Sequence, residues 1–204
     1  MRRALRTFPA LLALALLLSS CVTRTPVDRE ALGWAEDWTA LGDVAAAEPV
    51  EGFTPTDILD KMASTGLWYA AWSYGDGTEL TGDAEGDPVY LAQIYLLIQD
   101  CGSSEGAEME LEQWRATERE HYGCTQPVDE EYAGRVFSVM ELTAGGEKDL
   151  FDAGICAFTT VGSYALSVEV MALQEAPITL RGTLETFING LHLNLGEDGG
   201  ASAD

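Results

Sequence analysis

Basic side chains are scarce in this sequence. Its 204 residues include only 11 Lys and Arg against 34 Asp and Glu, which gives a formal net charge of −23. A surface of this sign is repelled by phosphate backbones, so we expect no nucleic-acid partner. Histidine is nearly absent, since His121 and His192 are the only two. No two cysteines have the short spacing of a zinc site, so we expect neither a metal ion nor another cofactor.

Motifs of known catalysis are missing as well. The sequence contains no Gly-x-Ser-x-Gly elbow and no glycine-rich phosphate loop. We therefore expect no enzymatic activity and assign no catalytic residue. A cell-envelope hydrolase is the alternative, because a catalytic triad is recognised by its geometry and 34 acidic residues offer many carboxylate pairs.

The N-terminus has the three parts of a secretory signal peptide. Arg2, Arg3 and Arg6 precede an apolar run at residues 8–18, and the small residues Ser19 and Ser20 follow it. The run has 11 residues, short of the ~20 that cross a bilayer as a helix. We expect residues 1–20 to be cleaved rather than to remain as a membrane span.

The residues Leu18-Ser19-Ser20-Cys21 resemble the lipobox of bacterial prolipoproteins. The resemblance implies that the Cys21 thiol receives diacylglycerol and that lipoprotein signal peptidase cuts just before it. It also implies an extracytoplasmic protein that is anchored to the outer face of the cell membrane. An ordinary signal peptide that ends at a chance cysteine is the alternative.

The expected mature chain is more acidic than the whole sequence. Removal of residues 1–20 leaves 184 residues and changes the formal charge from −23 to −26. Three further cysteines remain, and export favours their oxidation. We predict a disulfide between Cys101 and Cys124, with Cys124–Cys156 as its rival.

Periodicity and turn residues indicate the secondary structure. We expect helices over 28–46, 55–65 and 104–122 and from Pro177 to Gly190, the second from the capping signal Thr54-Pro55-Thr56-Asp57. Strands are expected over 67–74, 89–99, 135–142, 155–161 and 164–172, although 89–99 could also be helical. These elements predict an α+β domain with a mainly antiparallel sheet of about five strands and helices packed largely on one face.

The domain organisation follows from these elements. It comprises a signal peptide (1–20), a lipidated tether (21–27), one α+β globular domain (28–195) and a disordered acidic tail (196–204). In outline the globular part resembles small extracytoplasmic domains of actinobacterial lipoproteins and receptor-kinase sensors, from which we carry over no functional residue.

Two segments could bind a partner. Trp68, Trp72 and Tyr74 are expected on one face of the strand 67–74, where they form either a binding surface or part of the core. The acidic loop 76–87 could hold calcium, but its match to an EF-hand loop fails at Pro88 and Ile94. We expect a non-enzymatic domain that binds an envelope protein or a small apolar molecule, with a calcium-dependent module as a further alternative.

Overall fold

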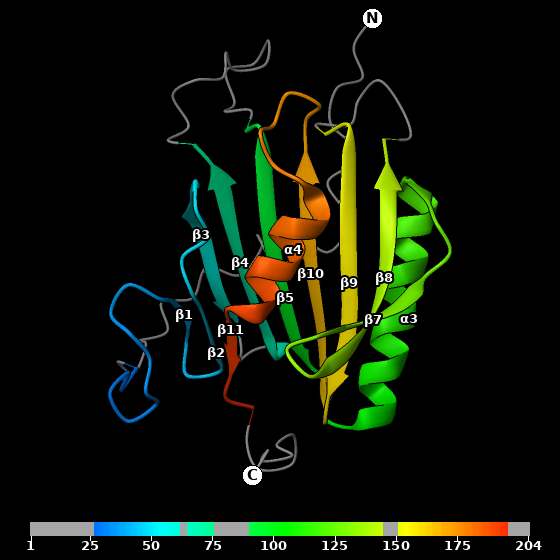
Figure 1. Cartoon of the computed structure of the whole chain (residues 1–204). Helices are drawn as coiled ribbons and strands as arrows, with labels where there is room; N and C mark the ends of the chain where they lie inside the picture. Colours follow the sequence, from blue (N-terminus) through cyan, green and yellow to red (C-terminus); the bar gives the residue numbers. More distant parts are fainter. Residues whose placement is uncertain (1–26, 62–64, 76–89, 145–150, 196–204) are drawn as a thin grey trace, which may run out of the picture.

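A computed structural model describes residues 27–61, 65–75, 90–144 and 151–195 (Figure 1). Two helices lie in these residues, α3 (Ser104–His121) and α4 (Leu180–Asn189). Eleven strands lie in them as well: β1 (Thr39–Leu41), β2 (Ala45–Ala47), β3 (Phe53–Lys61), β4 (Leu67–Tyr74), β5 (Ala92–Asp100), β6 (Gly123–Cys124), β7 (Val128–Tyr132), β8 (Arg135–Thr143), β9 (Ala153–Val161), β10 (Tyr164–Ala172) and β11 (Leu191–Leu193).

One large antiparallel sheet forms the centre of the molecule. Its strand order is β3-β4-β5-β10-β9-β8-β6, and β7 pairs with β8 alongside β6. Strands β3 to β5 form one meander and β8 to β10 another, and the pairing of β5 with β10 joins the two. The helix α3 connects β5 to β6 at the far edge. The short strands β1, β2 and β11 form a separate three-stranded sheet.

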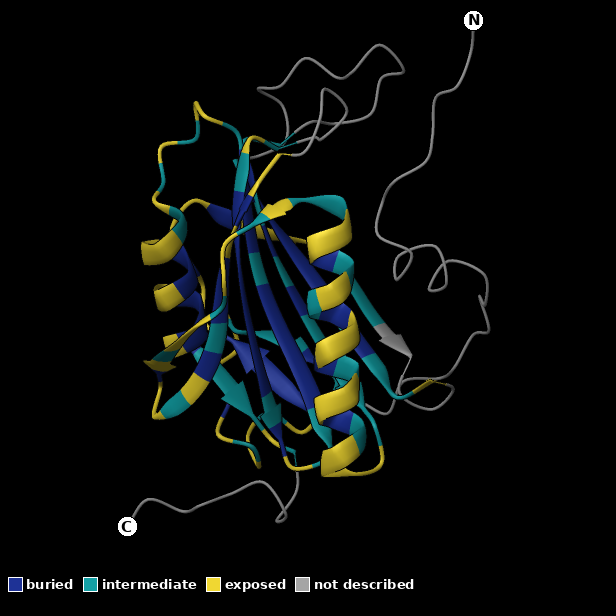
Figure 2. Cartoon of the chain, turned by 90° about the vertical axis from the view of Figure 1, so that its right-hand side faces the viewer, coloured by how far each residue is buried: buried dark blue, intermediate teal, exposed yellow. Residues whose placement is uncertain are grey.

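The two helices lie on opposite faces of the large sheet (Figure 2). Alternate residues of a strand point to opposite faces. On β10, the even-numbered residues from Leu166 to Ala172 join the core under α4, whereas Ala165 and Met171 pack with α3. The central strands are therefore covered on both faces, which explains why β9 and β10 are nearly continuous apolar runs.

The predicted fold class is wrong. The described residues are mostly β, with eleven strands and two helices rather than about five strands and four helices. The helices also cover both faces instead of one. The strands expected over 67–74, 89–99, 135–142, 155–161 and 164–172 are confirmed as β4, β5, β8, β9 and β10, and the last two expected helices are confirmed as α3 and α4.

The helix expected over 55–65 is wrong because tertiary pairing overrides a local capping signal. Residues Phe53–Lys61 form β3, which pairs antiparallel with β4. Pro55 cannot donate a backbone hydrogen bond, and β3 tolerates it because the strand is at the edge of the sheet and its register shifts between Pro55 and Asp57. Thr56 sits in this bulge and its hydroxyl is 3.0 Å from the Ser73 hydroxyl on β4.

The helix expected over 28–46 is also wrong. Gly33 and Gly42 have φ angles of 69° and 58°, which end any helical path in this segment. The Arg29 guanidinium donates to the carbonyl oxygens of Ala35, Glu36 and Trp38 at 2.9, 3.2 and 2.8 Å. These bonds hold a loop, and the chain then enters β1 and β2.

The core under α4 should depend strongly on Phe187. Its side chain is 1% exposed, and its ring meets Trp72 edge-on at 4.8 Å. We expect Phe187→Ala to lower the free energy of unfolding by about 3–5 kcal/mol, through lost burial and the cavity that remains. Glu185→Ala, on the exposed side of the same helix, is the control. Urea denaturation of both variants measures the difference, and equal loss in the two would contradict this packing.

Candidate functional site

Of the two alternatives for the aromatic side chains of β4, a binding surface or part of the core, the structure favours the core. Trp68 and Trp72 are each 2% exposed and lie in the core under α4. Tyr74 is half-buried and meets the Phe53 ring edge-on at 5.3 Å. The alternation of the strand was interpreted correctly, but the face that carries these three side chains points inward. Tyr69 is on the opposite face of β4, where its ring stacks on that of Tyr95.

The predicted Cys101–Cys124 disulfide is not formed. Cys101, Cys124 and Cys156 are free thiols. Cys101 lies just before α3 and Cys124 just after it, and a helix of 18 residues separates its ends by ~27 Å. Disulfide-linked Cα atoms lie within ~7 Å, so this pair cannot form. The rival pair is separated by β8, because Cys124 is on β6 and Cys156 on β9.

Each of the two histidines contacts groups of the surrounding fold, and the two are not brought together. The Nδ1 atom of His121 is 2.7 Å from the Thr117 carbonyl oxygen, within the last turn of α3. The His192 ring stacks on Trp38 at 4.0 Å, and its Nε2 atom is 3.0 Å from Glu48 Oε1. Cys21 and the acidic loop 76–87 lie outside the described residues. Within the described ranges, no three His, Cys, Asp or Glu side chains are grouped as metal ligands would be.

Two acidic residues that sequence analysis missed lie between α3 and the sheet. Glu118 is 5% exposed and occupies the buried stripe of α3 together with Ala107, Leu111 and Trp114. Glu169 is half-buried in β10, and its backbone pairs with Tyr95 on one side and Cys156 on the other. The sequence did carry a signal, because Glu118 interrupts the apolar stripe of α3 and Glu169 is the one charged residue of the strand β10.

The surroundings of Glu118 and Glu169 disfavour the ionised form of each carboxyl. Burial raises the pKa of Glu169, although a hydrogen bond from the Ser167 hydroxyl at 3.1 Å opposes this shift. Burial, and next the negative charge of Glu169, raise the pKa of Glu118 from 4.5 to about 8. The pair therefore retains at least part of a proton at neutral pH.

Four titratable groups around the pair, two thiols and two tyrosine hydroxyls, are neutral near pH 7, while the charged Arg119 acts on Cys124 and the charged Asp57 on Tyr69. Burial is the first cause that raises the pKa of the Cys156 and Cys124 thiols and of the Tyr95 and Tyr69 hydroxyls above their ordinary values. The charge of Glu169 raises the pKa values of Cys156, Tyr95 and Tyr69 further. Hence the protonation of this cluster near neutral pH is set by the carboxyl pair, in which the pKa of Glu118 is raised to about 8 and that of Glu169 lies above its ordinary value.

Two buried polar atoms beside the carboxyl pair lack a hydrogen-bond partner. They are Trp114 Nε1 and Glu118 Oε2, on side chains that are 2% and 5% exposed. The two residues are one turn apart on the same face of α3, where side chains four positions apart are neighbours. A buried donor or acceptor without a partner costs ~1–3 kcal/mol, so these atoms mark a position where a bound molecule could restore hydrogen bonds.

A row of polar and aromatic side chains extends from this pair across β5, β4 and β3. The Tyr95 hydroxyl donates to Gln93 Oε1 at 2.6 Å, and Gln93 Nε2 donates to the Ser73 hydroxyl at 3.0 Å. The Ser73 hydroxyl in turn meets that of Thr56, and the Tyr69 and Tyr95 rings stack at 6.2 Å. The described contacts of α3 are mainly with β10, β9 and β6, so this row lies beside the helix rather than under it. We call Glu118, Glu169, Trp114 and this row the α3-side polar face.

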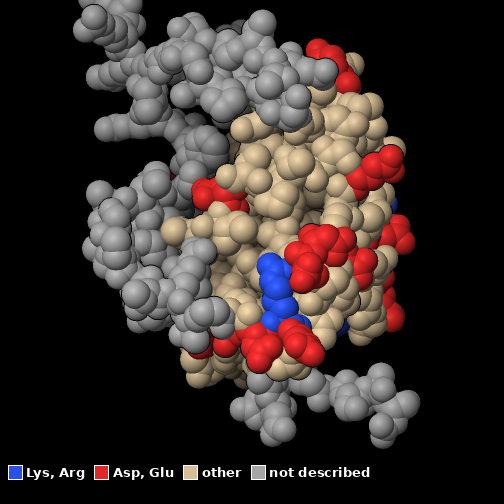
Figure 3. All heavy atoms as spheres, turned by 90° about the vertical axis from the view of Figure 1, so that its left-hand side faces the viewer, with Lys and Arg blue, Asp and Glu red and all other residues tan. Residues whose placement is uncertain are grey.

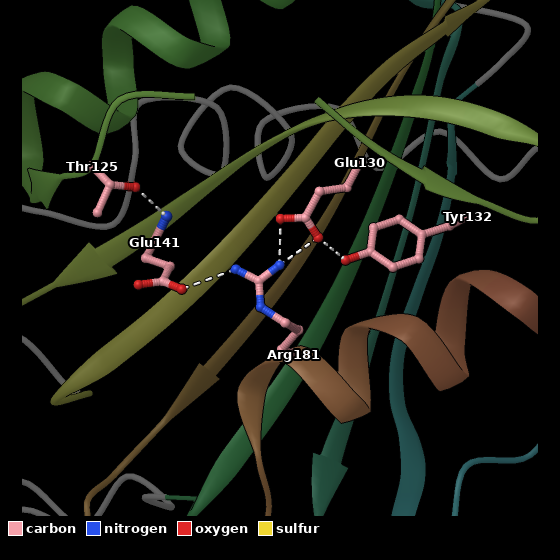
Figure 4. A network of polar contacts seen from close by, with 5 residues as sticks. All are labelled: Thr125, Glu130, Tyr132, Glu141 and Arg181. Carbon is pink, nitrogen blue, oxygen red and sulfur yellow. Dashed lines mark hydrogen bonds and ion pairs between the residues drawn. The ribbon is translucent and has the colours of Figure 1, made fainter. Parts of the chain in front are cut away.

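A second polar network, on the α4 side of the sheet, joins α4 to β7 and β8 at the surface. Arg181 on α4 forms ion pairs with Glu130 on β7 and Glu141 on β8, and Tyr132 also donates to Glu130 (Figure 4). Hydrogen bonds from Tyr132 and Arg181 hold the pKa of Glu130 below its ordinary value. The Arg181 side chain is 48% exposed, and exposed pairs contribute at most ~1 kcal/mol each. The network fastens α4 to the β7–β8 hairpin.

Comparison with known proteins adds little to this geometry. Neither the protein-family models nor the curated proteins give a match to the chain. One solved structure, from Bacteroides thetaiotaomicron, is similar with a TM-score of 0.48 and 8% sequence identity. The match covers 76% of this chain and 47% of that one, so the chain spans about half the length of that structure. No helix among the described residues is both long and apolar enough to cross a membrane.

The raised pKa of Glu118 predicts that stability falls as pH rises. A carboxyl whose pKa is higher in the folded state contributes most below its unfolded value, near 4.5, and its contribution is lost as pH rises to about 8. The pKa difference corresponds to a decrease of up to ~5 kcal/mol in the free energy of unfolding, at ~1.4 kcal/mol per pKa unit, and we expect Glu118→Gln to abolish this decrease. Urea denaturation at several pH values between 5 and 8.5 measures it.

Glu120→Gln is the matched control for this experiment, because it makes the same charge change at an exposed position of α3. The control should keep the pH dependence of the unaltered chain. If Glu118→Gln kept it as well, the buried environment assigned to Glu118 would be wrong.

Proposed function

We propose that this chain is an exported lipoprotein, anchored through Cys21 to the outer face of the cell membrane, that binds a small molecule and does not catalyse a reaction. The lipobox-like residues Leu18-Ser19-Ser20-Cys21, behind a cationic and then apolar N-terminus, support the anchor. Two acyl chains would supply the double membrane attachment that stable anchoring needs.

The observation that carries the binding function is the α3-side polar face. One end holds two carboxyls, of which Glu118 has an unpartnered oxygen, and the unpartnered Trp114 Nε1. The other end is a hydrogen-bonded row that contains buried, half-buried and exposed strand residues. A few convergent polar groups beside aromatic side chains are typical of small-molecule sites. These groups favour a ligand with polar or charged atoms over the wholly apolar molecule expected from sequence, and over an envelope protein.

Acylation of Cys21 is tested by intact-mass measurement of the full chain expressed in a bacterial host that processes lipoproteins. We expect a polypeptide that begins at Cys21 and carries a diacylglycerol adduct. Cys21→Ala should abolish both the adduct and the membrane fraction, whereas Cys101→Ala should leave them unchanged. A mature chain that begins elsewhere without an adduct would refute the anchor.

Ligand binding is tested by native mass spectrometry of the processed chain, purified from its own host and released from detergent. We expect an added mass beyond the acyl chains, and we expect Trp114→Phe with Glu118→Gln to reduce its occupancy. The exposed variant Glu120→Gln, which also alters one carboxyl of α3, is the control for charge. A bare acylated mass in the unaltered chain would contradict the binding function.

A further inference from the structure

The carboxyl pair of the α3-side polar face has no cationic partner. The ion pairs of the described residues use Glu112, Glu130, Glu141 and Glu48, and none uses Glu118 or Glu169. Removing carboxylates from water without a compensating charge is strongly unfavourable. No described side chain supplies that charge, so the pair holds part of a proton at neutral pH, and a bound cation would allow both carboxyls to ionise.

The groups around the pair favour an organic cation over a metal ion. A hard metal ion takes six or more oxygen ligands, whereas two carboxyls and three aromatic rings lie here. Tyr95 is the cross-strand neighbour of Glu169, the Tyr69 ring stacks on Tyr95, and Trp114 is one turn from Glu118. Aromatic faces attract ammonium groups, and this attraction adds to that of a carboxylate.

The charge of the whole chain acts in the same direction. The formal charge is −23. On the side of the molecule drawn in Figure 3, acidic side chains are spread over the described surface and basic ones form a small area. Such a field raises the local concentration of cations and lowers that of anions.

The unpartnered indole N–H adds a second feature to the ligand. Trp114 Nε1 is a donor only, so it requires an oxygen acceptor. A molecule that carries an oxygen atom close to its ammonium group would satisfy the indole and the carboxyl pair together.

From these observations we infer that Glu118, Glu169 and Trp114, with the Tyr69 and Tyr95 rings, form a binding site for a small alkylammonium compound that bears a hydroxyl or carbonyl oxygen. The inference rests on the proposed binding function and specifies its ligand class. Glu169, Tyr95 and Tyr69 are half-buried and so remain partly accessible to solvent, whereas Glu118 and Trp114 are buried.

Binding of a cation should release the proton that the carboxyl pair holds. The bound positive charge favours the ionised form of both carboxyls, and the released proton passes to solvent. Cys156, Cys124, Tyr95 and Tyr69 remain neutral in this range and do not contribute. The affinity should therefore rise with pH, by up to about tenfold per pH unit below pH 8.

The test uses isothermal titration calorimetry of the processed full chain in detergent, with choline as the probe because its charge does not titrate. The neutral analogue 3,3-dimethylbutan-1-ol keeps the shape and hydroxyl of choline, and tetramethylammonium keeps the charge without the hydroxyl. We expect choline to bind, tetramethylammonium to bind more weakly and the neutral analogue to bind at least tenfold more weakly. Titrations at pH 6.5 and 7.5, in two buffers of different ionisation enthalpy, measure proton release.

Variants locate the site. Glu169→Gln should weaken choline binding at least tenfold, and Glu120→Gln should leave it unchanged. Trp114→Phe should weaken the binding of choline while leaving that of tetramethylammonium unchanged, which separates the indole N–H from general packing. Circular dichroism confirms that each variant is folded, and the indole N–H resonance that Trp114→Phe removes should shift when choline is added to the unaltered chain.

The outcomes separate the ligand class from the binding function. Equal binding of choline and its neutral analogue, or a calcium signal that depends on Glu169, would overturn the organic-cation inference and leave a binding domain. The same holds if no probe binds while native mass spectrometry still shows an added mass. If no probe binds and the acylated chain is bare, the inference and the proposed function both fail.

Discussion

The antiparallel pairing of β5 with β10 is the interaction on which the rest of the structure depends. Nine residue pairs, from Tyr164↔Asp100 to Ala172↔Ala92, join two meanders that are otherwise separate in the sequence. The pairing makes β10 a central strand, so both of its faces must be covered, and α3 and α4 cover them. The same register sets Glu169 beside Tyr95 and directly under the path of α3. A shift by one residue would turn every side chain of β10 to the other face.

Most buried polar groups of the described interior have hydrogen-bond partners, and the groups without one lie on the α3 side of the sheet. The α4 side is an apolar core whose aromatic rings meet edge-on, and its polar rim is closed by the Arg181 ion pairs. The α3 side combines an apolar cluster with two carboxyls, an unpartnered indole and a row of hydrogen-bonded side chains. Leucine at positions 118 and 169 would suit such a layer better, because burial of ionisable groups is unfavourable. Retention of both carboxyls at a cost in stability is typical of a functional site.

The hydrophobic pattern of the sequence predicted an element correctly where the element is buried on both faces or where its apolar residues recur with one clear period. The strands β4, β5, β8, β9 and β10 and the helix α3 are of this kind, and each was predicted within a few residues. It failed for β3, where Thr54-Pro55-Thr56-Asp57 has the chemistry of a helix start but the chain pairs with β4. It failed again for β1, β2, β6 and β11, which have two or three residues each and are strands only because a partner lies alongside. The Cys101–Cys124 prediction failed because the helix between the two cysteines, which was itself predicted over 104–122, holds their Cα atoms ~27 Å apart.

The sequence by itself determined the acidic charge, the lipobox-like residues from which the proposed anchor derives, and the identity of the long central strands, since each depends on composition or on contiguous residues. Tertiary structure alone decided which face of β4 is buried, so that Trp68 and Trp72 became core and Tyr69 joined the α3-side polar face. It alone brought Glu118 and Glu169 together from positions 51 residues apart in the chain. The physical reason is that strand order and helix placement are set by the burial of whole faces, a property that no contiguous stretch of sequence contains.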